Sequence, residues 1–424
     1  MSAVMASPLF GLIDCNNFYC SCERVFEPRL NDSPLIVASN NDGCVVARSE
    51  QVKALGVPMG IPLFKIKKLI EQYQIRVFSS NYALYADMSR RVQTVVAGYI
   101  PQHQIYSIDE IFLSLEDEVD PYQACVRLRH EVAKQTGIPT SVGLGPTKTL
   151  AKIANYHAKK NPRFSGVCDA TNLAMRERLL KLTPVENIWG VGKALTQVCH
   201  RYSAKNAWEL AQLDLHTARK AANIGLEKLI RELGGLSCYE IDTVPAHPKS
   251  CAVTRSFSQP ITHLSDMLEA VANYATRAAE KCRNNQQLAR AMQVFMTTGV
   301  HRDHYYSASL CAQMTPANAD TRLFLRTARA LAEGCFQEGF QYKKAGVILF
   351  DLTTAEQGAL DFVDFDEKQS EQVMNTIDAI NQRHGRNTVF FGAQGIERAW
   401  AMQRAHCSSH YTTDIEQVPI VKAT

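Results

Sequence analysis

The chain has 424 residues, of which 46% are hydrophobic, and its 46 Lys and Arg residues nearly balance its 42 Asp and Glu residues to give a net charge of +4. At roughly 150 residues per domain, this length predicts about three domains. No apolar run approaches the ~18 residues of a membrane span, and the first residues lack the basic region of a secretory signal, so we expect a cytoplasmic protein. The net charge is too small to indicate nucleic-acid binding by itself.

The number and spacing of the thirteen cysteines indicate neither a complete disulfide framework nor a zinc ribbon. Their number is odd, and no C-x-x-C pair occurs anywhere in the chain. We therefore expect reduced cysteines that serve as ordinary core residues.

The first half of the chain alternates strand and helix patterns. The predicted elements are, in chain order, a buried strand over Phe10–Cys15, a helix directly after it, an inserted Pro- and Gly-rich subdomain at 26–77, a helix over 81–100, a helix near 124–135 and a strand over 140–145. Such an order resembles a split βαβ core with an insertion. The topology would place Asp14 and Asp109 on neighbouring strands.

The stretch "YSIDEIF", Tyr106 to Phe112, sets two acids in an apolar run. In an extended segment, Asp109 and Glu110 face opposite sides, so at least one carboxylate points toward apolar surroundings. A lone buried carboxylate is costly and is usually paired or bound to a cation. The alternative is an exposed turn from Ser107 to Glu110, because Ser and Asp are common turn formers.

The stretch from Gly145 to Arg163 carries five Lys or Arg residues and no acid. If a helix begins after Pro146, one face carries the three lysines Lys148, Lys152 and Lys159, and the opposite face carries the core residues Leu150, Ile153 and Ala154. A one-sided basic stripe can hold phosphates, although a solvated helix face has the same pattern. The spacing of a Walker A loop is absent.

The stretch "IWGVGKAL", Ile188 to Leu195, places two glycines at the start of a predicted helix. Gly190 and Gly192 would let backbone N–H groups approach a DNA phosphate, as in a helix-hairpin-helix module. An ordinary turn between helices is the alternative.

The later part of the chain has its own order. Residues 172–241 have a helical pattern throughout, and 249–352 follow the order βαββαβ. Residues 355–372 are acidic and are interpreted as a linker or partner-binding peptide. The remaining tail, with strand-like apolar residues in "HGRNTVFFGAQGI", predicts a small folded partner-binding module.

Asp14, Asp109 and Glu110 form the candidate acid cluster. Hard carboxylate oxygens on two adjacent strand ends suit Mg²⁺, and two such ions can support an in-line phosphoryl or nucleotidyl transfer. A structural ion site would use the same ligands.

The chain resembles the Y-family translesion DNA polymerases, and within them the UmuC branch, which comprises the catalytic subunit of DNA polymerase V and its plasmid-borne relatives. The resemblance runs from about Phe10 to Tyr411. It is carried by stretches in the family's order and spacing, namely "DCNNFYCSCE", "NNDGCVVAR", "SSNYALYADMS", "YSIDEIF", "TKTLAKIANYHAKK" and "IWGVGK". The implied α+β fold is a right-hand polymerase with a palm (1–25 and 78–171), fingers (26–77), a thumb with a helix-hairpin-helix (172–241), a little finger (249–352) and a C-terminal partner-binding region (353–424).

The resemblance also implies roles for individual residues. These are two Mg²⁺ ions on Asp14, Asp109 and Glu110, triphosphate contacts from Lys53 and Lys159, a steric gate at Tyr19, and DNA backbone contacts from Gly190, Gly192 and Lys193. The family usually has a tyrosine three residues before the position of Lys53, where this chain has Glu50.

The implied activity is error-prone, template-directed DNA synthesis from dNTPs in SOS-type damage tolerance. Primer–template DNA, a processed UmuD-type dimer and RecA are the implied partners. A sliding clamp would bind the stretch "QGALDFVDF" through Gln357, Leu360 and Phe362. The alternatives are a non-catalytic DNA-binding scaffold, which would have no need for a costly acid cluster, and a nucleotidyl cyclase, which would not explain a thumb and a second DNA-facing domain.

Overall fold

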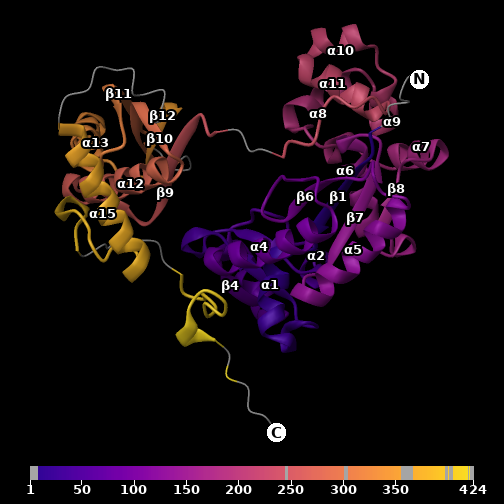
Figure 1. Cartoon of the computed structure of the whole chain (residues 1–424), viewed down its shortest axis with the longest axis horizontal. Helices are drawn as coiled ribbons and strands as arrows, with labels where there is room; N and C mark the ends of the chain where they lie inside the picture. The colour runs from indigo at the N-terminus through magenta and orange to yellow at the C-terminus, as the bar shows by residue number, and fades with distance from the viewer. Residues whose placement is uncertain are drawn as a thin grey trace. The chain divides into compact units, whose positions relative to one another are not determined.

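The computed structural model describes residues 8–243, 247–299, 304–354, 366–396, 400, 404–418 and 420. The chain divides into two compact units, which Figure 1 labels by element (Figure 1). The first unit comprises residues 1–39, 43–245 and 406–424, and the second comprises 40–42 and 246–405. The expected mixed α and β architecture, with a split core and a separate βαββαβ unit, is confirmed.

The first unit is built on a five-stranded sheet in the order β5-β6-β1-β7-β8. Its strands are β1 (Phe10–Cys15), β5 (His103–Ile105), β6 (Glu110–Ser114), β7 (Thr140–Gly145) and β8 (Val167–Asp169). The helices packed around it are α1 (Phe18–Phe26), α4 (Tyr82–Tyr99), α5 (Pro121–Thr136) and α6 (Lys148–Lys160). Strand β1 is central and runs antiparallel to both β6 and β7, while β7 and β8 are parallel.

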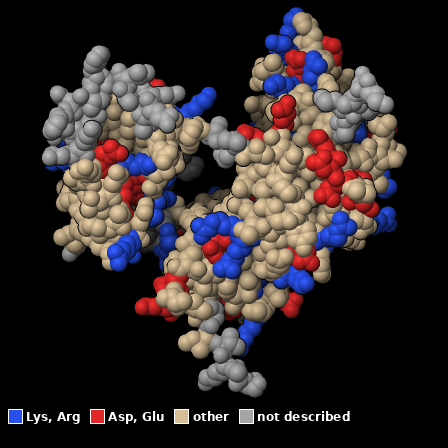
Figure 2. Space-filling model, viewed as in Figure 1, with Lys and Arg blue, Asp and Glu red and all other residues tan. Residues whose placement is uncertain are grey.

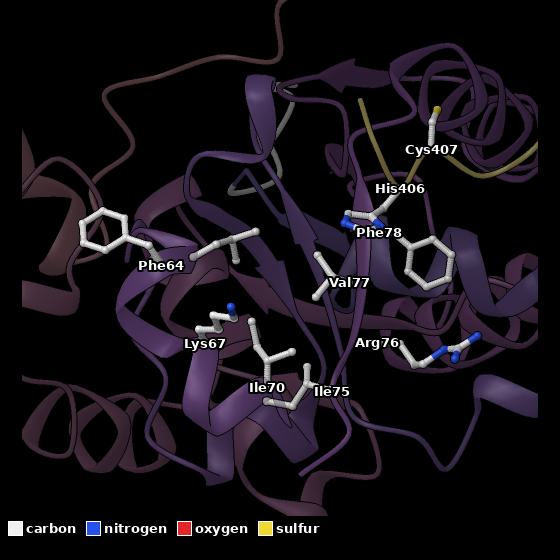
Figure 3. A pocket seen from close by; sticks show the side chains of 10 residues that line it. Phe64, Lys67, Ile70, Ile75, Arg76, Val77, Phe78, His406 and Cys407 are labelled. Atoms are coloured by element: carbon white, nitrogen blue, oxygen red, sulfur yellow. The ribbon is translucent and has the colours of Figure 1, made fainter. Parts of the chain in front are cut away.

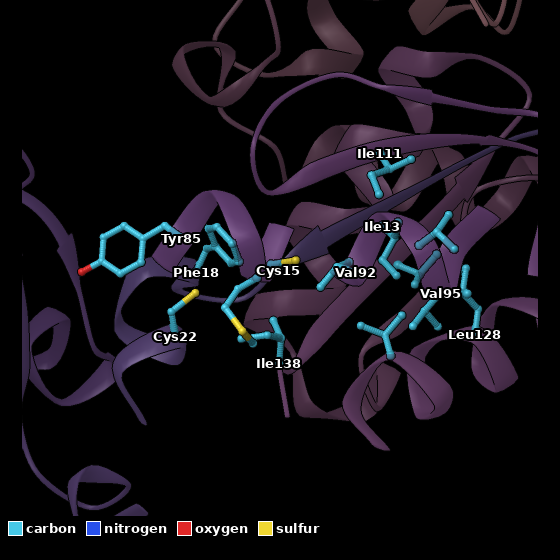
Figure 4. Packing of buried hydrophobic residues seen from close by; sticks show 14 of the residues in the cluster. Ile13, Cys15, Phe18, Cys22, Tyr85, Val92, Val95, Ile111, Leu128 and Ile138 are labelled. Atoms are coloured by element: carbon cyan, nitrogen blue, oxygen red, sulfur yellow. The ribbon is translucent and has the colours of Figure 1, made fainter. Parts of the chain in front are cut away.

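Helices cover both faces of this sheet, because successive side chains of a strand point to opposite sides. Ile13 and Ile111 belong to the core that α1, α4 and α5 complete (Figure 4). Leu12 and Phe112, the next residues along each strand, pack with Ala151 of α6 on the other face. Strands β1 and β6 are therefore buried on both faces, and a polar group at their ends lies beside a dry core.

A smaller sheet in the order β3-β2-β4 carries its own apolar core. Its elements are β2 (Leu35–Ala38), β3 (Val45–Arg48), α2 (Glu50–Ala54), α3 (Lys67–Gln72) and β4 (Arg76–Ser79). Strands β2 and β4 are parallel, which leaves β4 at one edge of the sheet. Residues 172–241 are helical, as the sequence predicts, with α7 (Leu173–Lys181), α8 (Lys193–Arg201), α9 (Ala207–Ala211), α10 (Leu215–Ala221) and α11 (Ile224–Leu233).

The second unit contains the predicted βαββαβ order, folded as a four-stranded sheet β11-β10-β12-β9. Its elements are β9 (Ser250–Ile261), α12 (Leu264–Asn284), β10 (Gln287–Thr298), β11 (Ser307–Asn318), α13 (Thr321–Cys335), β12 (Tyr342–Thr354) and α15 (Asp366–His384). Helices α12 and α13 share one apolar core with the sheet. Helix α15 is attached to α12 by Arg283, whose Nε and Nη2 donate to the two carboxylate oxygens of Asp378 at 2.6 and 2.8 Å.

The tail differs from its local pattern in two places. The acidic stretch, expected to be a linker or partner-binding peptide, is helical from Asp366 onward, and α15 forms an ion pair with α12 that no local pattern shows. Residues 389–391, whose apolar pattern is strand-like, form no strand, and the chain there turns into a short 3-10 helix at Gly392–Gln394 whose Gln394 carbonyl accepts from Asn273 at 2.7 Å. The partner-binding role of the tail stays a prediction.

Two further observations concern the cysteines and the apolar helices of the described part of the chain. All thirteen cysteines are free, and most are buried. Among the helices that the structure describes, none is long and apolar enough to cross a membrane. The boundaries proposed for palm, fingers, thumb and little finger stay a prediction.

Helix α6 approaches β7 so closely that only glycine fits at position 143. A Cβ added there would lie 2.1 Å from the backbone N of Asn155 and 2.2 Å from the carbonyl O of Ala151. Both atoms belong to the helix backbone, so relief requires the helix to move. Asn155 fixes the contact from the other side, because its Nδ2 donates to the carbonyls of Leu12 and Ser141 at 3.2 and 2.8 Å.

We predict that Gly143→Ala lowers the free energy of unfolding by about 1 to 3 kcal/mol, the usual cost of overpacking a core. Thermal unfolding followed by circular dichroism would measure it. The matched control is Gly98→Ala in α4, where an added Cβ meets open space and should stabilise by ~0.5–1 kcal/mol. Equal melting temperatures for Gly143→Ala and the wild type would contradict the close approach.

Candidate active site

Pairing between β1 and β6 brings the backbones of the three candidate acids next to one another. Asp14 is the register partner of Glu110, and the N–H of Cys15 donates to the carbonyl of Asp109 at 2.8 Å. Asp14 is 7% exposed, whereas Asp109 and Glu110 are partly exposed. The strands β1 and β6 are neighbours, as predicted, but Asp109 directly precedes β6 and does not belong to it.

A turn at Ser107, just before β6, orients Asp109 and Glu110. Residues 107–109 form bends and the strand begins at Glu110, so the turn alternative is correct for the first part of the stretch. The Ser107 hydroxyl donates to Asp109 Oδ1 at 2.6 Å and accepts from the N–H of Glu110 at 3.0 Å. These bonds hold the Asp109 carboxylate at the end of the sheet beside Asp14.

Two lysines of α6 neutralise two of the acids. Lys159 Nζ lies 2.5 Å from Asp14 Oδ2, and Lys152 Nζ lies 2.9 Å from Glu110 Oε1. The lysine side chains are 34% and 14% exposed, so this face of α6 is turned toward the sheet. The interpretation as a solvated helix face is wrong, and the predicted apolar face of Leu150, Ile153 and Ala154 is buried.

The pKa of Asp14 is raised to about 7, mainly because burial disfavours its charged form. The neighbouring Lys159 opposes this rise, while the charges of Glu110 and Asp109 add to it. A carboxyl in these surroundings is easily ionised by any further positive charge. A cation beside these carboxyls would favour their charged forms, and their hard oxygen atoms are donors that Mg²⁺ prefers.

Lys148 has a different role from the one its position in the basic stripe indicates. It is 4% exposed, and its Nζ donates to the side-chain oxygen of Gln104 and, at 2.6 Å, to the carbonyl of Glu240. Burial lowers the pKa of this lysine. Lys148 thus joins β5 to the chain that leaves α11, while Lys152 and Lys159 face the acids.

An aromatic cluster surrounds Lys152, and the sequence analysis missed it. The Nζ of Lys152 lies 4.5 Å from the ring centroid of Tyr106 and 5.4 Å from that of Trp189. Trp189 Nε1 donates to the Tyr106 hydroxyl at 2.9 Å, and Phe112 packs against both rings. The rings lie around the Lys152 ammonium group, which is directed toward Glu110.

Tyr19 lies in the first turn of α1, just after the end of β1. The turn into the helix is made by Asn17 in the left-handed conformation with φ 47°, which Asn tolerates well. The ring of Tyr19 stacks on Tyr85 with centroids 4.3 Å apart and meets the edge of Tyr82 at 6.3 Å. Burial raises the pKa of Tyr19, and the charges of Tyr82 and Asp109 contribute to the rise.

Lys53 is tied to Glu50, the residue that departs from the family pattern. Its Nζ donates to Glu50 Oε1 at 2.7 Å and to Asn17 Oδ1 at 2.5 Å. Asn17 Nδ2 donates to the same Glu50 oxygen at 3.0 Å. This triangle places Lys53 next to the turn between β1 and α1.

The glycine pair of residues 190 and 192 has open backbone. Gly190 has φ +87° and Gly192 precedes α8, and a Cβ added at either position would meet nothing within 4 Å. Lys193 opens the helix. Figure 2 shows Lys and Arg side chains in several separate groups, interspersed with Asp and Glu, on the face drawn (Figure 2).

The remaining candidates cannot be placed. Gln357, Leu360 and Phe362 lie outside the described residues. Within the described ranges, no group of three or more His, Cys, Asp or Glu side chains is arranged to hold a metal ion, and Asp14 and Glu110 form ion pairs with lysines.

The fold is that of a Y-family DNA polymerase. A chain titled "Y-family DNA polymerase chimera Dbh-Dpo4(243-245)-Dbh" superimposes with a TM-score of 0.66 at 16% identity, covering 82% of this chain and 99% of that one.

The sequence defines the family. Residues 13–156 match the model described as "impB/mucB/samB family", residues 248–362 match that family's C-terminal domain, and residues 371–421 match a domain of unknown function. The protein ImpB of Salmonella typhimurium is 39% identical over 98% of this chain and 100% of its own length. Protein UmuC of Salmonella typhimurium is 38% identical with the same coverage, and the DNA polymerase IV of Caulobacter vibrioides is 25% identical over 90% of this chain and 92% of its own. The chain belongs to the impB/mucB/samB family.

We predict that Lys148→Met lowers the free energy of unfolding by about 1 to 3 kcal/mol, because Gln104 and the Glu240 carbonyl lose a buried donor. Thermal unfolding would measure it. The exposed Lys134→Met in α5 is the control and should change stability by no more than about 0.5 kcal/mol. An unchanged melting temperature for Lys148→Met would contradict the structural role.

Proposed function

We propose that the protein is a translesion DNA polymerase that adds nucleotides from dNTPs to a primer 3'-hydroxyl by two-metal catalysis. The observation that carries the proposal is the register of β1 against β6, which pairs Asp14 with Glu110 next to Asp109, while lysines of α6 form ion pairs with Asp14 and Glu110. The relatives named as DNA polymerases and the Y-family fold support it.

The three acids are the groups that would hold two Mg²⁺ ions. When bound, the ions lower the pKa of the attacking hydroxyl and stabilise the leaving phosphate oxygen. The neighbouring strand ends fix where the carboxylates stand, and the Ser107 turn fixes the direction of Asp109.

The lysines prepare the site for a triphosphate. Lys159 and Lys152 now balance the charges of Asp14 and Glu110. When a nucleotide brings its own negative charge, Lys159 leaves the Asp14 carboxylate and binds a phosphate, and Lys53 of α2, which contacts Asn17, binds a second phosphate. Lys152 stays directed by its aromatic neighbours. The lysine pairs keep the acid cluster from repelling itself until the nucleotide arrives.

Tyr19 is the residue that we assign to sugar selection. It lies in the first turn of α1, just after β1, the strand that carries Asp14. A nucleotide held by its phosphates at the acids would lay its deoxyribose against this ring, and a 2'-hydroxyl would overlap with it.

The remaining parts bind DNA and partners. Gly190, Gly192 and Lys193 contact the duplex backbone through open N–H groups, and residues 249–352 bind DNA as the little finger. Action in SOS-type damage tolerance with a processed UmuD-type dimer and RecA, and clamp binding through Gln357, Leu360 and Phe362, belong to the same proposal. A non-catalytic scaffold is the second candidate, and the first test below separates the two.

We predict that Asp109→Ala abolishes Mg²⁺-dependent primer extension while DNA binding and melting temperature stay near wild type. Extension of a labelled primer on undamaged and abasic templates would measure it. Asp117→Ala, an exposed acid beyond the other end of β6, is the matched control and should extend normally. Extension by Asp109→Ala at a near wild-type rate would contradict the assignment of Asp109 as a metal-binding residue and favour the non-catalytic scaffold.

We predict that Tyr19→Ala admits ribonucleotides at least about tenfold more readily, or ~1.4 kcal/mol in transition-state free energy, while polymerase activity is retained. Single-nucleotide insertion of dNTP and rNTP would measure the selectivity. Tyr122→Ala, a partly exposed ring on α5, controls for the loss of an aromatic side chain. Unchanged selectivity in a stable, active Tyr19→Ala variant would remove Tyr19 from the gate.

A further inference from the structure

The last described part of the chain, residues 406–418, returns to the first unit and is called here the C-terminal segment. It adds to the free edge of β4 in the small sheet. Ser79 N–H donates to the carbonyl of His406 at 2.9 Å, the N–H of His406 donates to the Ser79 hydroxyl at 2.9 Å, and Cys407 pairs with Ser79 in parallel. Figure 3 shows His406 and Cys407 beside Phe78 on the wall of a pocket of about 710 Å³ (Figure 3).

Two further contacts attach the C-terminal segment to helices α1 and α4, which pack against the five-stranded sheet. Asn81, fully buried at the start of α4, donates from Nδ2 to the carbonyl of Ser408 at 3.2 Å and to its hydroxyl at 3.1 Å. Tyr411 stacks on Phe26 at the end of α1 with centroids 4.7 Å apart and an interplanar angle of 11°. The segment is therefore held by α1, α4 and β4 together.

The Ser408 hydroxyl reaches a buried carboxylate that the proposed chemistry does not use. Glu23 of α1 is 2% exposed, and its Oε1 accepts from Ser408 at 3.1 Å and from the Tyr85 hydroxyl at 2.6 Å. Among the described residues, no Lys or Arg forms an ion pair with Glu23. Two hydroxyl donors thus satisfy a carboxylate that would otherwise be costly to bury.

Glu23 in turn holds the hydroxyl of Tyr85, the residue on which the Tyr19 ring stacks. Tyr85 is fully buried, and its hydroxyl points away from the labelled core side chains in Figure 4 (Figure 4). Its ring lies nearly parallel to that of Tyr19, at an interplanar angle of 16°. Ser408, Glu23, Tyr85 and Tyr19 therefore form one unbroken path of contacts, from the C-terminal segment to the sugar position.

We propose that the C-terminal segment sets the sugar selectivity of the polymerase, with Ser408 and Glu23 acting as positioning residues for Tyr19 through Tyr85. This inference rests on the proposed gate at Tyr19. It gives a role to the end of the region that matches a domain of unknown function. Tilting a stacked pair away from its position opens the space that a 2'-hydroxyl needs, so anything that loosens the hydroxyl contacts at Glu23 admits ribonucleotides.

The test compares insertion of dNTP and rNTP by full-length variants. Ser408→Ala should lower selectivity for dNTP by about two- to tenfold, the range of one lost hydrogen bond, through a higher kcat/KM for rNTP with little change for dNTP. Ser408→Thr keeps a hydroxyl and should restore selectivity. Thr413→Ala, an exposed side chain of the same segment, is the matched control and should behave as wild type.

A second set of variants removes the Tyr85 hydroxyl, which is the other donor to Glu23, and the Tyr19 ring itself. Tyr85→Phe keeps the ring stack but loses the hydroxyl, so it should lower selectivity to a similar extent. In a Tyr19→Ala background, Ser408→Ala should add no further loss, because the ring it positions is gone.

The outcomes separate the two claims. If Tyr19→Ala loses selectivity but Ser408→Ala and Tyr85→Phe keep it, or if Ser408→Ala slows dNTP and rNTP insertion equally, the positioning role is overturned and the gate stands. If Tyr19→Ala itself keeps full selectivity, the gate fails and the positioning role falls with it.

Discussion

The antiparallel pairing of β1 with β6 is the constraint on which the rest of the active site depends. It sets Asp14 opposite Glu110 and brings the backbone of Asp109 to Cys15. Because side chains alternate along a strand, a slip of one residue would turn Asp14 into the core and remove it from the other acids. Packing on both faces opposes such a slip, since Ile13 and Leu12 fill different cores.

Helix α6 packs into the apolar core with one side and contacts the candidate active site with the other. Its apolar side packs against the neighbouring helices, its contact with β7 is closed by Gly143, and its basic side faces the acids. The same rigid contact that buries Ala151 therefore fixes how far Lys159 stands from Asp14. A site held in this way has two of its three carboxyls paired with lysines and is preorganised for a nucleotide that brings phosphates.

The sequence predicted those features that depend on local pattern and on ordered motifs. The strand at Asp14, the helix that carries Lys152 and Lys159, and the order of the second unit follow from periodicity. The role of Lys148 and the aromatic surroundings of Lys152 did not, because Glu240 and Trp189 are brought to them only by the fold. The contact of Ser408 with Glu23 spans 385 residues, which no spacing rule can indicate. Helix α15 was missed because its stability comes from Arg283 of another helix.

The account is tested most directly by crystals of the protein with primer–template DNA, a non-hydrolysable dNTP and Mn²⁺, with anomalous scattering used to locate the metal. We expect two Mn²⁺ ions bound by Asp14, Asp109 and Glu110, with Lys159 turned from Asp14 to the triphosphate. Bound nucleotide with no Mn²⁺ at these carboxylates, and with the lysine pairs still intact, would contradict it.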